Sequence, residues 1–331
     1  VTWLMTSPAA KGLFHKAIAQ SAQQLPVRHQ TQEKLGMASA ESMDAHYMAS
    51  LGIKDLKGMR ALPADKLLLA PQDFQEGKFG GAMVDGQIII GDSIPLFAKG
   101  MQHKVPFMIG VNSWDASFFA LGQPPVNAYI KKMGEDPKVI KKLYAGFKDA
   151  CVLSAEIMAD GWYRGGVKLL ADSANKYAPT YAYEYSYLTP TIRDSHIGAA
   201  HTFELPYVFG DLGSVLPAPA KAQSGVNKCK HINLAIADMK ERAVWSPYWF
   251  PMADPANPED QSMAEQLAKS WTAFAKTGNP NYGDKEIWPR YDIKNDVMRA
   301  FSQGKQTTVR NLYKERVDYQ IKAVKSRYHI E

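Results

Sequence analysis

The chain has 331 residues, of which 46% are hydrophobic and 22% are charged, and its formal net charge at pH 7 is +6. These values place it in the ordinary globular class, with enough length to bury a large core in one domain or two. No apolar run approaches the roughly twenty residues that would span a bilayer, so we expect a soluble protein.

The positive charge is spread thinly along the chain. Its densest late cluster is Lys322, Lys325 and Arg327, which we interpret as a solvated helix face because no nucleic-acid signature accompanies it. The two cysteines, Cys151 and Cys229, have neither the spacing of a metal site nor the density of a disulfide scaffold. We expect two buried or half-buried thiols; a single bridge, which would indicate an oxidising compartment, stays open.

Apolar periodicity and breaker residues divide the chain into alternating helices and strands. The first half is predicted to contain, in order, a helix end at 4–5, a buried strand at 16–20, short helices over 31–70, an extended stretch at 80–90, a helix at 94–98 and a strand at 105–111. The second half is predicted to contain helices over 126–177, a strand at 181–187, a helix at 263–277, a strand at 298–302 and a terminal helix at 312–328.

Three of these segments carry the strongest signals. Residues 105–111 read V-P-F-M-I-G-V, a continuous apolar run typical of a strand buried on both faces. Between 181 and 187 tyrosine occupies every second position, which is the strand period. The helix over 263–277 ends at Gly278, where a C-cap glycine is expected. Strands alternating with helices predict an α/β fold with one mostly parallel sheet and helices on both faces.

Two loops that follow predicted strands hold side chains capable of acid–base chemistry. Asp115 comes shortly after the strand at 105–111, and His201 comes on the loop after the tyrosine strand. In parallel sheets such loops converge at one edge, so a carboxylate there can orient an imidazole that acts as a general base. The order acid then histidine is the order that follows the serine in α/β-hydrolases, but by spacing alone the signal is weak.

The residues around both side chains resemble a known family. Residues 110–119, G-V-N-S-W-D-A-S-F-F, look like the G-x-N-x-D-E-G-S segment of type-B carboxylesterases and cholinesterases, and Asp115 falls on the catalytic acid. Residues 198–210, G-A-A-H-T-F-E-L-P-Y-V-F-G, resemble the family's G-A-x-H-G-x-E-L-P-Y-V-F-G, which places the catalytic histidine on His201.

Further matches extend the resemblance over nearly the whole chain. They are L-F-H-K-A-I-A-Q-S at 13–21, L-P-A at 62–64, V-D-G at 84–86 and W-T-A-F-A-K-T-G-N-P-N at 271–281. The resemblance implies that residues 1–331 form a single α/β-hydrolase domain that lacks its N-terminal part. The segment 211–261 is longer than expected for bacterial relatives, and we interpret it as an insertion or lid-like segment.

Two positions depart from the family pattern. The glycine that usually follows the histidine is Thr202, and the usual Glu-Gly pair is Asp115-Ala116, although aspartate also serves as the acid in α/β-hydrolase triads. The resemblance also places the serine of the G-x-S-x-G elbow, and the oxyanion loop, upstream of Val1. The chain opens abruptly there, and we expect it to have been cut from something longer, with an N-terminal fragment or second chain completing the domain.

The resemblance implies roles for further residues. Ser21 falls where the family places a hydroxyl near the triad acid, and a simple turn cap is equally compatible with it. Glu204 matches the family's buried glutamate, with a surface charge as the alternative. Phe118, Phe119 and Leu205, which lie within the two motifs, are expected to line the substrate pocket. His196 lacks the surrounding motif and is a weak competitor for His201.

The function that follows is that of a serine carboxylesterase acting on small to medium carboxylic esters through an acyl-enzyme, without metal or organic cofactor. A catalytically silent binding or adhesion module of the same fold is the alternative, and the residue at the elbow decides between them. The isolated 331 residues are expected to be inactive, because neither the serine nor the oxyanion donors follow Val1. They are also expected to aggregate unless an N-terminal partner chain is present, because the missing strands would leave a sheet edge unpaired and an apolar face uncovered. The sequence leaves the compartment and the oligomeric state undecided.

Overall fold

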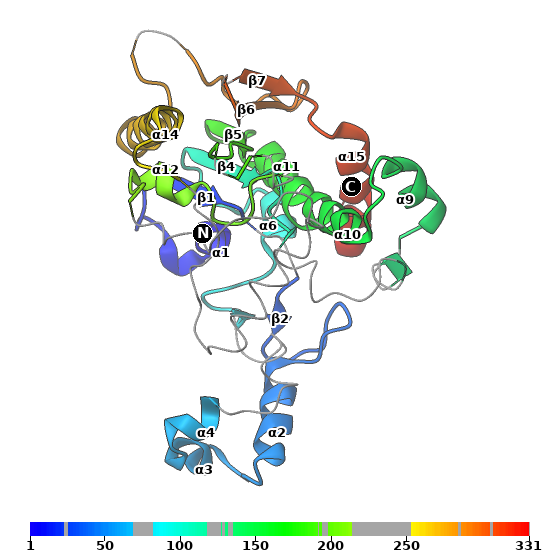
Figure 1. Ribbon diagram of the computed structural model, residues 1–331. Coiled ribbons are helices and arrows are strands. Elements are labelled where there is room, and N and C mark those ends of the chain that lie inside the picture. The colour runs from blue at the N-terminus through cyan, green and yellow to red at the C-terminus, as the bar shows by residue number, and fades with distance from the viewer. Residues whose placement is uncertain are drawn as a thin grey trace.

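A computed structural model describes residues 1–22, 26–68, 82–117, 127, 130–131, 135–190, 192–193, 198–213, 253–283, 286–304 and 307–330. At its centre is a five-stranded sheet of order β1-β4-β5-β6-β7 (Figure 1). Its strands are β1 (Ala17–Gln20), β4 (Phe107–Asn112), β5 (Thr180–Tyr185), β6 (Val297–Phe301) and β7 (Thr307–Arg310).

Neighbouring strands from β1 to β6 are parallel, and only the β6–β7 pair is antiparallel. All six residues of β4 are buried, as the continuous apolar run predicted. The strand predicted from the tyrosine alternation is present as β5, and all six of its residues are buried as well. The mostly parallel sheet predicted from the sequence is therefore confirmed. The edge strand β7 was not predicted, because its residues T-T-V-R are largely exposed and carry no apolar period.

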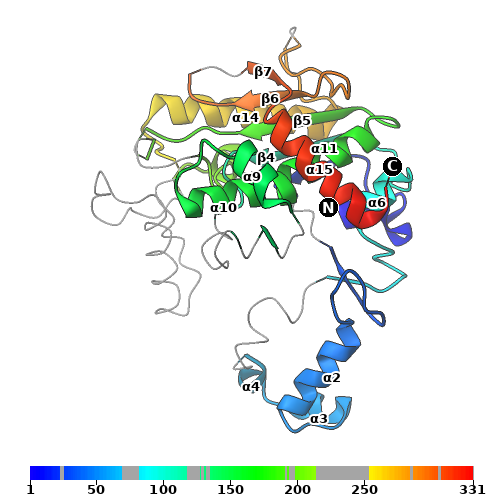
Figure 2. The same cartoon turned by 90° about the vertical axis from the view of Figure 1, so that its right-hand side faces the viewer.

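The two faces of the sheet bury two separate hydrophobic clusters. Alternate residues such as Phe107, Ile109 and Ala182 pack on one face, and Met108 and Tyr183 pack on the other, since strand side chains alternate in direction. The first face is covered by α6 (Ser93–Ala98), α10 (Ala150–Met158), α11 (Gly165–Ala174) and α15 (Lys314–Tyr328). The second is covered by α12 (Leu205–Phe209) and α14 (Pro258–Thr277), so helices lie on both faces (Figures 1 and 2).

Two short elements precede β1, namely α1 (Thr2–Thr6) and the 3-10 turn η1 (Pro8–Ala10). The two-residue strands β2 (Arg28–His29) and β3 (Met83–Val84) pair in parallel in a second, small sheet. Beyond it, α2 (Ala40–Ser50), α3 (Leu56–Ala61) and α4 (Ala64–Leu68) project away from the main sheet (Figure 2). These are the short helices that the sequence predicted over 31–70.

The predicted start of that helical region at 31 is wrong. Leu35 has a φ of 51° and an isolated bridge joins Lys34 to Met37, so the chain turns back on itself before any helix begins. The helix α2 begins at Ala40 because the side chain of Ser39 accepts a hydrogen bond from Ser42 N at 3.1 Å.

The helical region after 126 contains a feature that its apolar pattern did not reveal. This region contains the helices α9 (Pro137–Leu143), α10 and α11. A π-helical turn, η2 (Ala159–Arg164), connects α10 directly to α11. Such turns insert an extra residue into a helix and occur frequently at functional sites. The terminal helix α15 begins at Lys314, later than predicted, because Tyr313 has a φ of 53° and cannot continue a helix.

Gly110 in β4 lies opposite Tyr183 in β5. A Cβ at Gly110 would come within 2.2 Å of Tyr183 Cδ1, so the tyrosine ring occupies the space where a side chain would stand. The glycine inside this otherwise apolar strand is therefore explained by close packing, and the sheet gains a buried aromatic ring in exchange.

We expect Gly110→Ala to lower the free energy of unfolding by about 1–3 kcal/mol, because the new methyl group forces the Tyr183 ring out of its position. Gly146→Ala is the matched control, since Gly146 is exposed and nothing lies within 4 Å of a Cβ there. Urea unfolding of both variants measures the difference. Equal unfolding midpoints would contradict this reading of Gly110.

Candidate active site

Asp115 and His201 lie in direct contact at the carboxyl edge of the sheet. Nδ1 of His201 is 2.7 Å from Oδ1 of Asp115. The other carboxylate oxygen, Oδ2, accepts a hydrogen bond of 2.8 Å from Asn112 N at the end of β4. The Asp115 side chain is fully buried, whereas 39% of the His201 side chain is exposed. Because the carboxylate accepts at Nδ1, the imidazole carries its proton there, and Nε2 is left as the free base.

The loop that carries Asp115 is joined to the loop that carries His201. Trp114 N donates to Ala199 O at 2.9 Å, and Ala199 N donates to Ser113 Oγ at 3.0 Å. The two loops approach closely at Gly198, where a Cβ would stand 2.7 Å from Ser113 Oγ. The glycine of the G-A-x-H motif is therefore required by this contact.

A chain of hydrogen bonds runs beneath the pair. Trp271 Nε1 donates to Gln20 Oε1 at 3.0 Å, which orients the Gln20 amide so that its Nε2 donates to Glu204 Oε1 at 3.0 Å. Asn112 Nδ2 donates to Glu204 Oε2 at 2.5 Å and to Ala200 O at 2.7 Å. Glu204 is buried, which excludes the surface-charge alternative, and it fastens the end of β1 to the end of β4.

Another buried carboxylate, Asp260, anchors the segments on either side of the His201 loop. It accepts hydrogen bonds from the hydroxyls of Tyr187, Thr189 and Tyr207 and from Asp254 N, all between 2.6 and 2.9 Å. The residues after β5, the helix α12 and the start of α14 are thus held at one point. These four donors compensate the buried charge of Asp260.

Local charges shift the acid–base properties of the site. Burial lowers the pKa of His201, but the hydrogen bond to Asp115, its charge and that of Glu204 together outweigh burial, so the pKa is raised above the ordinary value. Burial, followed by the negative charge of Asp115, raises the pKa of Glu204, against hydrogen bonds from Asn112 and Gln20.

Of the other site residues predicted from the sequence, those that the structure describes make no hydrogen bond to Asp115 or His201. Ser21 follows β1 with a φ of 48°, and its buried Oγ has no hydrogen-bond partner within the described part of the chain. Leu205 is half-buried at the first position of α12. Several predictions fall outside the described residues: Phe118, Phe119, His196, Cys229, the side chain of Cys151 and 214–252 of the expected insertion. Residues 258–261 of that expected insertion form the first turn of α14.

The sequence reasoning missed four residues that shape the site. Asn112, Gln20 and Trp271 sit inside quoted motifs, so the signal was present, but only their hydrogen bonds reveal that they meet at Glu204. Tyr163, on the π-helical turn η2, packs its ring against His201 with centroids 6.1 Å apart. No sequence pattern pointed to Tyr163, because its contact depends on the irregular turn.

Comparison with known proteins agrees with this architecture. A solved carboxylesterase from Geobacillus stearothermophilus superimposes with a TM-score of 0.72 at 23% identity, covering 97% of this chain and 61% of that one. The fold is that of the α/β-hydrolase carboxylesterases. The family model described as "Carboxylesterase family" matches residues 1–148 and 240–320, and the chain belongs to that family.

Individual relatives are distant. A fumonisin B1 esterase from Sphingopyxis macrogoltabida is 24% identical over 313 residues, covering 91% of this chain and 51% of the relative. Liver carboxylesterase 1F from Rattus norvegicus is 24% identical over 346 residues, covering 93% of this chain and 55% of the relative. The chain spans about half the length of the curated relatives it matches.

None of the helices in the described ranges is long and apolar enough to cross a membrane. Likewise, no group of three or more His, Cys, Asp or Glu side chains in the described ranges is arranged to hold a metal ion.

Thr202, which stands where the family pattern has glycine, has a φ of 75°. A β-branched side chain is strained in this left-handed conformation, and glycine is not. We expect Thr202→Gly to raise the free energy of unfolding by about 1 kcal/mol, because the relief of strain exceeds the added chain entropy of glycine.

The matched control is Thr272→Gly on the exposed side of α14, where the helix is regular and the same exchange is expected to lower the free energy of unfolding by roughly 0.3 kcal/mol. Thermal and urea unfolding give both values. Loss of stability in Thr202→Gly as large as in Thr272→Gly would show that Thr202 is unstrained.

Proposed function

We propose that this chain carries the acid and the general base of a serine carboxylesterase that acts through an acyl-enzyme. The observation that carries the proposal is the 2.7 Å contact between the fully buried carboxylate of Asp115 and a half-exposed His201. Nε2 of His201 has no hydrogen-bond partner within the described residues and is positioned to receive a proton from a hydroxyl. Family membership supports ester hydrolysis as the reaction.

In the proposed mechanism, Nε2 of His201 removes the proton from a serine hydroxyl as that oxygen attacks the ester carbonyl. The imidazolium that forms is stabilised by the negative charge of Asp115, which keeps the proton on Nδ1. His201 then donates its proton to the leaving alcohol. A water molecule, activated by the same nitrogen, hydrolyses the acyl-enzyme and restores the serine.

The nucleophile in this proposal is a serine outside residues 1–331. Ser21 is a poor candidate, because its buried hydroxyl follows a strand without the glycines of a nucleophile elbow. The proposal assigns Ser21 and Glu204 to the support of the acid and histidine, with Glu204 acting through Asn112, whose N–H binds Asp115. Leu205, with Phe118 and Phe119, is assigned to the wall of the acyl pocket.

The proposed substrates are small to medium carboxylic esters. Esterases among the relatives, including a para-nitrobenzyl esterase from Bacillus subtilis, agree with that class. The chemistry needs no metal or organic cofactor, because the serine, the histidine and backbone donors complete it. An N-terminal segment or second chain that supplies the serine is part of the same proposal.

Substitutions at the pair test the roles directly. In the protein that also carries the serine, His201→Ala is expected to lower kcat by several orders of magnitude, with thermal unfolding little changed. Asp115→Asn is expected to lower kcat about 10⁴-fold, since an amide can hold the imidazole in the wrong tautomer. Asp115→Glu keeps the carboxylate and is expected to retain more activity than Asp115→Asn. Near-normal hydrolysis by His201→Ala would remove His201 from the mechanism.

The pH dependence follows from the raised pKa of His201. The base must be neutral to act, so kcat/KM is expected to fall on the acid side with a midpoint above 6.5, the ordinary value for histidine. A pH profile of kcat/KM for two esters with different leaving groups measures it, and both should give the same midpoint because kcat/KM reports the free enzyme. A midpoint at or below 6.5 would contradict the expected effect of Asp115.

A further inference from the structure

Arg164, the last residue of the π-helical turn η2, is a buried cation that contacts three separate elements. Its Nη1 binds Glu156 Oε2 at 2.9 Å and Asp160 Oδ1 at 2.6 Å. Its Nη2 donates to the carbonyl oxygen of Ser113, in the loop that leads to Asp115. The guanidinium also lies 4.2 Å from the ring centroid of Tyr313. The two carboxylates neutralise the charge while one arm reaches the active-site loop.

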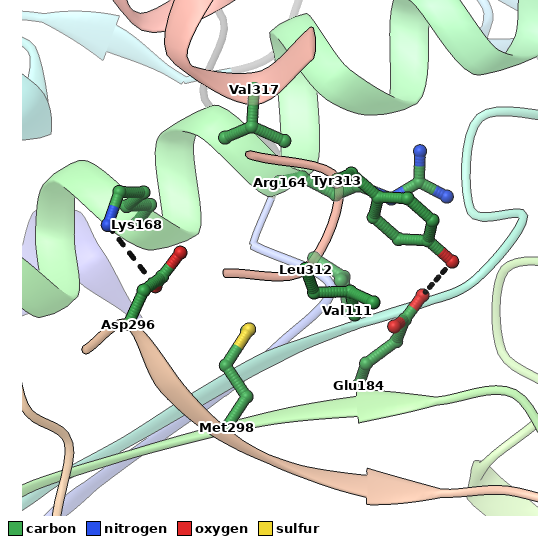
Figure 3. A pocket seen from close by; sticks show the side chains of 9 residues that line it. All are labelled: Val111, Arg164, Lys168, Glu184, Asp296, Met298, Leu312, Tyr313 and Val317. Atoms are coloured by element: carbon green, nitrogen blue, oxygen red, sulfur yellow. Dashed lines mark hydrogen bonds and ion pairs between the residues drawn. The ribbon is translucent and has the colours of Figure 1, made fainter. Parts of the chain in front are cut away.

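Figure 3 shows the surroundings of this cation. Arg164 lies beside Tyr313, whose hydroxyl donates to Glu184 at 3.1 Å, and these side chains line a small cavity of about 20 Å³ together with Val111. Only 6% of the Arg164 side chain is exposed. The orientation of the guanidinium is therefore fixed by packing and ion pairs, so that Nη2 is held rigidly against the Ser113 carbonyl.

Ser113 is the residue through which the two active-site loops are joined. Its N–H donates to Tyr185 O at 2.8 Å, at the end of β5, and its Oγ accepts from Ala199 N at 3.0 Å. The next peptide N–H, that of Trp114, donates to Ala199 O. The carbonyl of Ser113 is the remaining polar group of this junction, and Arg164 binds it.

We propose that Arg164 is a positioning residue of the esterase: it holds the Ser113 carbonyl and so fixes the loop on which Asp115 meets His201. The inference rests on the proposed function. It also gives a purpose to the π-helical turn, because its consecutive residues Tyr163 and Arg164 contact the His201 ring and the Asp115 loop respectively.

Arg316 provides a matched control within the same ion cluster. It binds the same two carboxylates, Glu156 Oε2 at 3.1 Å and Asp160 Oδ2 at 3.2 Å, but not Ser113. A role in charge balance alone predicts that Arg164→Lys and Arg316→Lys behave alike. A positioning role predicts that they differ, because lysine at 164 keeps the charge but lacks the second arm that reaches Ser113.

The experiment uses the protein that includes the nucleophile. Arg164→Lys is expected to lower kcat about 10- to 100-fold with KM within about twofold, since a small misplacement of a catalytic group reduces the rate without weakening binding. Arg316→Lys is expected to keep kcat within about threefold. The downfield proton resonance of His201 Nδ1–H, which reports the hydrogen bond to Asp115, is expected to broaden or shift only in Arg164→Lys.

Each outcome decides one question. Equal kcat in the two lysine variants, or an unchanged Nδ1–H resonance in Arg164→Lys, would overturn the positioning role. If the unsubstituted protein hydrolyses no ester, the proposed function fails, and the resonance still tests the positioning role independently. If Arg164→Lys does not fold, the double variant Glu156→Gln/Arg164→Gln replaces it. This variant removes one negative and one positive charge together, and Asp160 keeps its ion pair with Arg316. The same loss of kcat is expected, because the contact with Ser113 is removed.

Discussion

The fully buried carboxylate of Asp115 is the constraint around which the site is organised. A charge taken out of water is tolerated only when hydrogen bonds and opposite charge compensate it. One oxygen is satisfied by Asn112 N, which fixes the loop directly after β4, and the other requires the imidazole of His201. The raised pKa of His201 is the other side of the same interaction, since the carboxylate stabilises the imidazolium.

The positions of distant segments follow from that requirement. Trp271 on α14, Gln20 on β1 and Glu204 after the histidine loop are joined by hydrogen bonds that end at Asn112, the residue that also binds Asp115. Each member fixes the orientation of the next amide or carboxylate, so replacing one would leave a buried polar group unpaired. Four of the sequence motifs that resemble the family therefore each contribute one residue to a single polar network.

On its opposite side, the loop that carries Asp115 is contacted by Arg164, a member of a buried cluster of ion pairs. The cluster of Glu156, Asp160, Arg164 and Arg316 joins α10, η2 and α15 and combines ion pairs with aromatic contacts. Buried ion pairs contribute little net stability after desolvation, but removing one partner is strongly destabilising because it leaves a buried charge uncompensated. Strain appears on the same loop system at Thr202, where a non-glycine residue adopts a left-handed conformation beside the proposed base.

The sequence by itself determined the sheet strands β1, β4 and β5 and the helix α14, because apolar period and capping residues are local properties of the chain. Asp115 and His201 were singled out by the resemblance of their surrounding motifs to the carboxylesterase family, since their spacing alone is a weak signal. The sequence did not determine β7, the late start of α15 or the π-helical turn, which lack a local period and depend on what packs against them. Nor could it show that Gln20, Asn112 and Trp271 meet at Glu204, or that Arg164 holds Ser113. Those contacts join residues far apart in the chain, and only the folded arrangement of the sheet brings them within hydrogen-bonding distance.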